Sequence, residues 1–246
     1  CTIESPPERS IRVAAGSAML ERIRSDPGEP NGFKLATLCR TLEQVRAAAA
    51  ESVDLIYVDF HDIREYADVP KIVRRADVPF GIATVRMQKP GEMGLLRVLK
   101  RHQPDFVLAR NLAAIDYFRD HSIATIADFS LNGANHRSAE WIRSLGPERV
   151  TASYDLNRDQ LLDLVDSVPP PWLEVVLHQH VPMFHMEHCV FCSVLSPGTD
   201  KTNCGRPCDD HVVKLRDRVG AEHALQADVA CRNTLYNAVP QSGAET

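Results

Sequence analysis

The chain has 246 residues, of which 44% are hydrophobic and 25% are charged, and its formal net charge is −5. This composition is typical of a globular protein with one large domain or two modest ones. The negative net charge excludes a general polyanion binder. No run of eighteen apolar residues and no secretion signal is visible, so we expect a cytoplasmic protein that does not bind a membrane.

The N-terminal part is expected to be a connecting segment rather than a domain. The chain begins with Cys1 instead of methionine, and we expect it to follow the N-terminal remainder of a longer protein. Residues 1–32 are rich in Pro, Ser, Gly and charge, with one helical pattern at 11–23. They are expected to form a linker or the tail of a preceding segment.

A repeating unit occupies residues 33–180. Short apolar runs predict strands at residues 34–38, 55–60, 80–85, 106–109, 125–129, 150–153 and 173–177. Amphipathic stretches predict helices at residues 41–50, 63–75, 91–101, 112–120, 138–145 and 159–165. Alternation of this kind predicts parallel strands. Because no Gly-rich phosphate-binding turn is present, we expect a TIM-like (β/α) barrel, incomplete by one strand, rather than an open dinucleotide-binding sheet.

The pattern changes after residue 180. Residues 181–239 are expected to form a Cys-rich metal-binding extension, in which alternating stretches at 211–219 and 224–230 predict a β-hairpin. Lys214, Arg216 and Arg218 share one face of this hairpin, where they could contact an RNA backbone or simply be solvated. Residues 240–246 read as a tail.

Cysteines are concentrated in the extension. The chain has seven, and five of them follow the spacing Cys189-x-x-Cys192, Cys204-x-x-x-Cys208 and, much later, Cys231. In a reducing cytosol such crowding indicates a metal or redox site rather than a disulfide framework. Zinc usually binds two Cys-x-x-Cys pairs, so the mixed spacing favours an iron–sulfur cluster, with zinc or metal-free thiols as alternatives. We expect Cys189, Cys204, Cys208 and Cys231 as ligands and Cys192 as the reserve.

Histidine and acidic side chains near the cysteines are the catalytic candidates. His178 and His180 alternate at the end of a predicted strand, and Glu187 and His188 immediately precede the first cysteine of the cluster. Each histidine could equally be a satisfied core or surface residue, and Glu187 could hold a neighbouring loop instead of acting as a general acid or base. Cys39, at the end of the first predicted strand, could also point toward the same mouth.

The ends of the barrel strands predict a second set of candidates, because active sites of (β/α) barrels lie at the C-terminal ends of the strands. Four substrate-binding candidates are expected there: Arg40, Arg86, Arg110 and Asn132. Guanidinium groups bind carboxylates and phosphates through paired hydrogen bonds, so these residues indicate an anionic substrate. The alternative is that the arginines form ion pairs with Asp59 and Asp128 or are solvated.

A stretch of the sequence resembles the collagenase-like peptidase family U32. The resemblance rests on LEVVLHQHVPMFHMEHC at residues 173–189, on Cys204-Gly-Arg-Pro-Cys208 and on Cys231-Arg-Asn. Residues 57–60, 110–112, 128–132 and 155–157 are similar as well, so that the resemblance extends over about residues 34–238. Many family members carry a cysteine seven positions before the one that matches Cys189, where this chain has Pro182. Cys192 could replace it locally.

The resemblance implies two kinds of activity. The family name implies a protease, and therefore a hydrolase. Better-understood relatives imply a [4Fe–4S] cluster on four cysteines and oxygen-independent hydroxylation of ubiquinone precursors or of an RNA base, with prephenate as the oxygen source for several.

Two functions are therefore compatible with the sequence. One is an iron–sulfur protein that supports hydroxylation of an RNA base or small aromatic, and the other is a peptidase or peptide-binding barrel with a structural metal. The protease motifs Gly-x-Ser-x-Gly and His-Glu-x-x-His are absent from the sequence. Cys189 could act as a nucleophile with His185 or His188 as base, although this leaves four neighbouring cysteines without a role.

Overall fold

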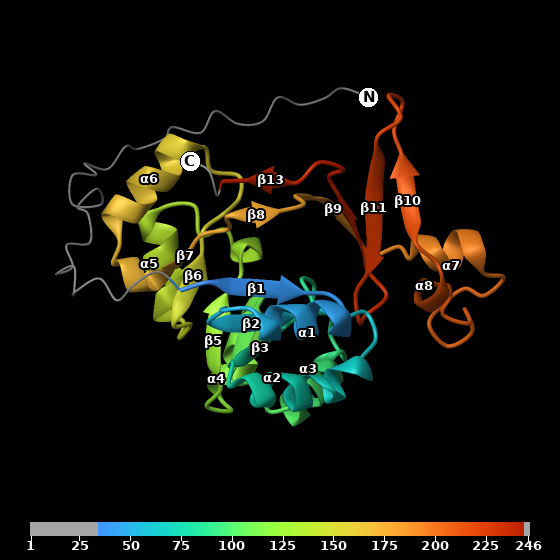
Figure 1. Cartoon of the computed structure of the whole chain (residues 1–246), viewed down its shortest axis with the longest axis horizontal. Helices are drawn as coiled ribbons and strands as arrows, with labels where there is room; N and C mark the ends of the chain where they lie inside the picture. Colours follow the sequence, from blue (N-terminus) through green and yellow to red (C-terminus); the bar gives the residue numbers. More distant parts are fainter. Residues whose placement is uncertain (1–33, 244–246) are drawn as a thin grey trace, which may run out of the picture.

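The computed structural model describes residues 34–243. The predicted linker at residues 1–32 and the last three residues of the predicted tail lie outside the described residues. Seven strands form one parallel sheet in chain order (Figure 1). They are β1 (Ala36–Cys39), β2 (Leu55–Val58), β3 (Phe80–Ala83), β4 (Phe106–Ala109), β5 (Ala124–Ala127), β6 (Arg149–Thr151) and β7 (Leu173–Glu174). The seven predicted strands are confirmed.

Helices connect consecutive strands: α1 (Leu42–Ala50), α2 (Val69–Ala76), α3 (Met93–Arg101), α4 (Leu112–Arg119), α5 (His136–Ser144) and α6 (Arg158–Ser167). Three 3-10 turns lie between these elements: η2 (Glu65–Ala67), η3 (Phe129–Leu131) and η4 (Pro170–Trp172). The helix predicted at residues 63–75 is divided into η2 and α2. Pro70 explains the division, because a residue without an N–H group fits the first turn of a new helix better than a helix interior.

The sheet curls but does not close, since β1 and β7 are its two edges. The fold is thus an incomplete TIM-like (β/α) barrel, as predicted. A polar contact connects the second strand to the last: the Tyr57 hydroxyl on β2 donates to Glu174 on β7 over 2.9 Å, and Arg149 Nε donates to the same carboxylate over 2.9 Å. Gly81 makes room for the Tyr57 ring, because a Cβ at this position would lie 2.7 Å from it.

The barrel core consists of apolar side chains between the sheet and the helices. All residues of β2 and β3 are buried, as expected for parallel strands covered on both faces. Cys39 belongs to this core, where it is 1% exposed and burial raises the pKa of its thiol to about 11. The suggestion that Cys39 points toward the other cysteines is therefore wrong.

The C-terminal part is more elaborate than the predicted hairpin. The hairpin itself is confirmed as β10 (Val213–Arg216) and β11 (Glu222–Ala227). It belongs to an antiparallel sheet of order β10-β11-β12-β9, which adds β12 (Asn233–Tyr236) and β9 (Pro182–Met186). Gln241–Ser242, which we expected in a tail, forms β13 and pairs with β8 (His178–Gln179). None of the described helices is long and apolar enough to cross a membrane.

The two faces of the C-terminal sheet have different neighbours. One face packs against the short helix α7 (Val190–Leu195) in a small apolar cluster of Phe191, Leu225 and Leu235. Side chains alternate along a strand, so His185 and Thr234, paired across β9 and β12, lie on the other face. The sheet therefore has α7 on one face and His185 and Thr234 on the other.

Candidate functional site

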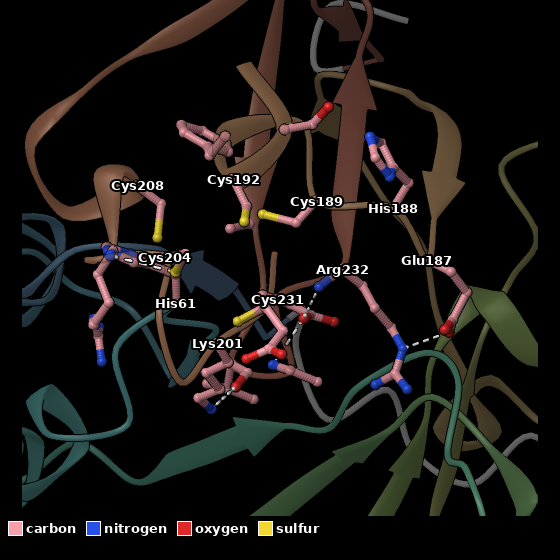
Figure 2. A pocket seen from close by; sticks show the side chains of 18 of the residues that line it. His61, Glu187, His188, Cys189, Cys192, Lys201, Cys204, Cys208, Cys231 and Arg232 are labelled. Carbon is pink, nitrogen blue, oxygen red and sulfur yellow. Dashed lines mark hydrogen bonds and ion pairs between the residues drawn. The ribbon is translucent and has the colours of Figure 1, made fainter. Parts of the chain in front are cut away.

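Five cysteines line one pocket of about 640 Å³ (Figure 2). Cys189 precedes α7 and Cys192 lies within it. Cys204 lies in the following loop, Cys208 in α8 (Pro207–Asp210), and Cys231 in the turn between β11 and β12. The structure thus brings together all four predicted metal ligands and the reserve cysteine, from three separate parts of the extension.

Tight turns bring these segments together. The loop after α7 folds back so closely that a Cβ on Gly198 would lie 2.4 Å from the Asn203 carbonyl oxygen. Between the second pair of cysteines, Gly205 and Arg206 both adopt left-handed backbone conformations, with φ of 67° and 57°. Cys231 has a φ of 63°. Such conformations are uncommon for residues with side chains and occur where the fold requires them.

The thiols influence one another electrostatically. Burial raises the pKa of Cys208 to about 11, and the charges of Asp209, Cys231 and Cys189 add to this effect. Burial also raises the pKa of Cys192, with further contributions from Cys204 and Cys189. Adjacent thiolates repel one another, and a bound cation reverses this effect by favouring the deprotonated sulfur.

Hydrogen bonds divide the sulfurs into acceptors and donors. Cys204 Sγ accepts from the Arg206 backbone N–H over 3.4 Å, and Cys189 Sγ accepts from Asn233 Nδ2 over 3.9 Å. Cys192 Sγ instead donates to the Gly198 carbonyl oxygen over 3.4 Å, and Cys208 Sγ donates to Asp209 Oδ1 over 4.0 Å. An accepted N–H bond favours a thiolate, whereas a donated S–H bond requires a protonated thiol.

The described residues contain no group of three or more His, Cys, Asp or Glu side chains arranged around one metal ion. Ligands of one zinc ion must all lie about 2.3 Å from it. Each cysteine of an iron–sulfur cube binds a different iron, so the sulfurs stand further apart. The sulfur-rich donor set matches the soft ligand preference that zinc and iron–sulfur clusters share.

A buried arginine lies at the edge of the same pocket. Arg232 is 2% exposed, and its Nε donates to Glu187 over 2.6 Å while Nη2 donates to both oxygens of Glu92 over 2.9 Å. Lys89 also pairs with Glu187. Hydrogen bonds from Lys89 and Arg232 lower the pKa of Glu187. The catalytic candidate Glu187 is thus an ionised carboxylate that joins the extension to the loop before α3, as in the alternative interpretation.

The histidine candidates divide into two groups. His188 lines the cysteine pocket beside Glu187. His178 lies on β8, and His180 follows it with Nδ1 2.8 Å from the Asn237 carbonyl oxygen. Both are exposed and are not among the residues that line the pocket. The structure therefore does not bring His178 and His180 to the cysteines.

The barrel mouth shows ion pairing. Asp59 Oδ2 accepts from Arg40 Nη1 over 2.7 Å and from Arg110 Nη1 over 2.9 Å, and Arg110 Nε lies 3.6 Å from Asp128. The alternative interpretation therefore holds for these two arginines. Arg86 has no carboxylate partner among residues 34–243, and its guanidinium lies 5.6 Å from the centre of the Phe129 ring.

Asn132 does not join these arginines through any hydrogen bond that we observe in the described chain. It is exposed and ends η3 in a left-handed conformation with a φ of 65°. Its conformation is that of a turn residue, which Asn adopts more readily than most side chains.

A sequence comparison now identifies the family. The family model described as peptidase family U32 matches residues 89–228, which is more than half of the chain. The chain belongs to peptidase family U32. No curated protein matches it.

Two solved structures are similar to this U32 chain at low identity. The U32 peptidase Mk0906 is 12% identical with a TM-score of 0.48, and the match covers 58% of this chain and 67% of that one. A glycerol uptake operon antiterminator-related protein from Thermotoga maritima is 13% identical with a TM-score of 0.39, with 59% and 95% covered. Likenesses at these values carry no argument about activity.

Sequence reasoning missed the contacts that attach the extension of the U32 chain to its barrel. Arg206 Nη2 lies 3.3 Å from Asp62, and His61 Nε2 lies 3.1 Å from Asp209. The Cys231-Arg-Asn motif was a signal for Arg232, but nothing in it named Glu92 as the partner.

Proposed function

We propose that this U32 domain is a [4Fe–4S] protein that supports oxygen-independent hydroxylation of an RNA base or a small aromatic molecule. The observation that carries the proposal is the convergence of five thiols on one pocket. Such a cluster supplies one-electron chemistry.

Cys189, Cys204, Cys208 and Cys231 are the proposed ligands. The accepted N–H bonds at Cys189 and Cys204 support their roles as thiolates. Among the catalytic candidates His178, His180 and His188, only His188 lines the pocket, where it could contact a substrate near the cluster.

An anionic small molecule, such as prephenate, is the proposed co-substrate. Arg86 supports this proposal because its charge is not neutralised by a carboxylate among the described residues, and His185 Nε2 nearby is buried without a hydrogen-bond partner in them. RNA has weaker support. On the hairpin, Lys214 Nζ lies 2.9 Å and Arg216 Nη2 3.9 Å from Glu222, which partly neutralises the basic face.

The decisive experiment is anaerobic purification and reconstitution with iron and sulfide. We expect absorbance near ~400 nm and ~4 irons per chain, as a cube requires. Serine at each proposed ligand should lower the iron content. Cys39→Ala is the matched control, because it removes a thiol that lies in the barrel core. A colourless protein with one tightly bound zinc contradicts the proposal.

Peptidase activity is the second candidate, supported by His188 and Cys189 together at the pocket wall. It predicts casein or gelatin cleavage that Cys189→Ser abolishes and iron chelation leaves unchanged. That result would replace the iron–sulfur proposal.

A further inference from the structure

Three consecutive residues connect two of the three cysteine-bearing segments of the pocket. Cys231 supplies a thiol, and the two residues after it contact separate partners. Asn233 is fully buried; its Oδ1 accepts from the Val190 backbone N–H over 2.7 Å, and its Nδ2 donates to Cys189 Sγ over 3.9 Å. One side chain thus holds both the sulfur of Cys189 and the backbone next to it.

Arg232 holds the same segment from the other side. Its bonds to Glu187 fix the residue two positions before Cys189, and its bonds to Glu92 fix the loop that begins α3 in the barrel. The Arg232 side chain is only 3% exposed, so these charge-assisted bonds are shielded from solvent. Arg232 and Asn233 therefore determine together how the chain around Cys189 lies relative to Cys231.

We propose that Asn233 and Arg232 are positioning residues that set the sulfur of Cys189 beside that of Cys231. Asn233 does so by an N–H···S bond, and Arg232 by anchoring Glu187 and Glu92. Groups that orient metal ligands without binding the metal commonly control its retention. Only the effect on a cluster rests on the proposed function; the placement of the two sulfurs does not.

The first test uses the metal-free chain. Dibromobimane bridges two neighbouring thiols, and peptide mass spectrometry measures the fraction of chains bridged between Cys189 and Cys231. Asn233→Asp keeps an oxygen that can accept from Val190 but removes the donor to sulfur. We expect the bridged fraction to fall several-fold in Asn233→Asp and in Arg232→Lys, which can reach only one of its two carboxylates.

Asn111→Asp is the matched control. Asn111 Oδ1 accepts from the Ala114 backbone N–H over 2.8 Å, and its Nδ2 donates to the Val85 carbonyl over 2.7 Å. It repeats the contacts of Asn233 with a carbonyl in place of the sulfur, so its substitution should leave the bridged fraction unchanged. If Asn233→Asp does not fold, Asn233→Ser removes the same donor without a buried charge.

The second test measures the reconstituted protein. The half-life of its absorbance under an iron chelator should shorten roughly 10-fold in Asn233→Asp and Arg232→Lys, the lower end of the usual effect on metal retention. Folded variants with wild-type bridging overturn the positioning role. A wild-type chain that binds no iron, yet bridges in a manner that depends on Asn233, refutes the proposed function and supports the positioning role.

Discussion

The barrel and the cysteine extension differ in the interactions that stabilise each of them. Eighteen buried barrel residues form the main core together with Val229 of the extension, whereas Phe191, Leu225 and Leu235 are the buried core of the extension itself. Apolar burial stabilises in proportion to the area removed from water. The barrel can therefore rely on its core, while the extension depends on polar contacts and, in our proposal, on a bound inorganic centre.

Removal of the metal is expected to have the largest effect on this comparison. Binding free energy of a structural metal contributes directly to folding. We expect chelation to abolish amide protection in β9 to β12 and to leave β2 to β5 protected, as measured by hydrogen exchange. Reconstitution should restore the lost protection. Unchanged exchange of the extension after complete iron loss would show that its own contacts suffice.

Two phenylalanines, one in each core, allow the two cores to be tested independently. Phe118 is 0% and Phe191 is 3% exposed. Phe118→Ala should lower the free energy of unfolding of the barrel by about 3–5 kcal/mol, because the cavity remains largely unfilled. Phe191→Ala should leave barrel unfolding unchanged and reduce iron retention. Denaturant unfolding, with hydrogen exchange measured in each region, distinguishes the two variants. An equal loss of stability in both regions would mean that the two cores unfold together.

His185, on the face of the C-terminal sheet opposite α7, should make the free energy of unfolding depend on pH. Burial, followed by the charges of Arg86, Arg110 and Arg232, lowers the pKa of His185 to about 4. The unfolded imidazole titrates near pH 6.5, so it binds a proton first as the pH falls. The free energy of unfolding should therefore be highest above about pH 6.5 and decline towards about pH 4.

His185→Gln should remove about 1–3 kcal/mol of this decline, because glutamine does not titrate and His185 is only partly buried. Denaturant unfolding at a series of pH values measures it. His121→Gln is the control, since His121 is exposed on the barrel. A decline of equal size in the His185 variant would assign the pH dependence to other groups.

Lys214 should give the smallest effect. Its ion pair with Glu222 at 2.9 Å joins two half-exposed side chains, and exposed pairs contribute little. We expect Lys214→Ala to lower the free energy of unfolding by less than about 0.5 kcal/mol. A larger loss in thermal unfolding would show that the extension depends on its surface charges.

The same contrast explains what the sequence could predict. The barrel strands and helices follow local periodicity, and β4 was predicted with its correct bounds. The β12–β9 pair joins residues 47 apart, such as Asn233 and Met186, and local patterns do not encode such pairing. Both strands are short, and β9 begins with proline, which is uncommon in strands.

The site divides in a similar way. The cysteine spacing predicted that the sulfurs share one site, and all five line the pocket. At the barrel mouth, sequence position placed Arg40 and Arg110 near Asp59 without deciding between an ion pair and a substrate site. Arg232 contacts Glu92 across 140 positions of the chain. Such a contact depends on how two folded regions dock, which no local pattern reveals.

The contact across the open barrel constrains which substitutions the chain can accept. Any residue with a Cβ at position 81 would collide with the Tyr57 ring, and a smaller residue at position 57 would lose the hydrogen bond to Glu174, 117 positions away. Positions 57 and 81 should therefore change together or not at all among related sequences. A chain with alanine at position 81 should also have replaced Tyr57, whereas Glu174 can remain because Arg149 donates to it as well.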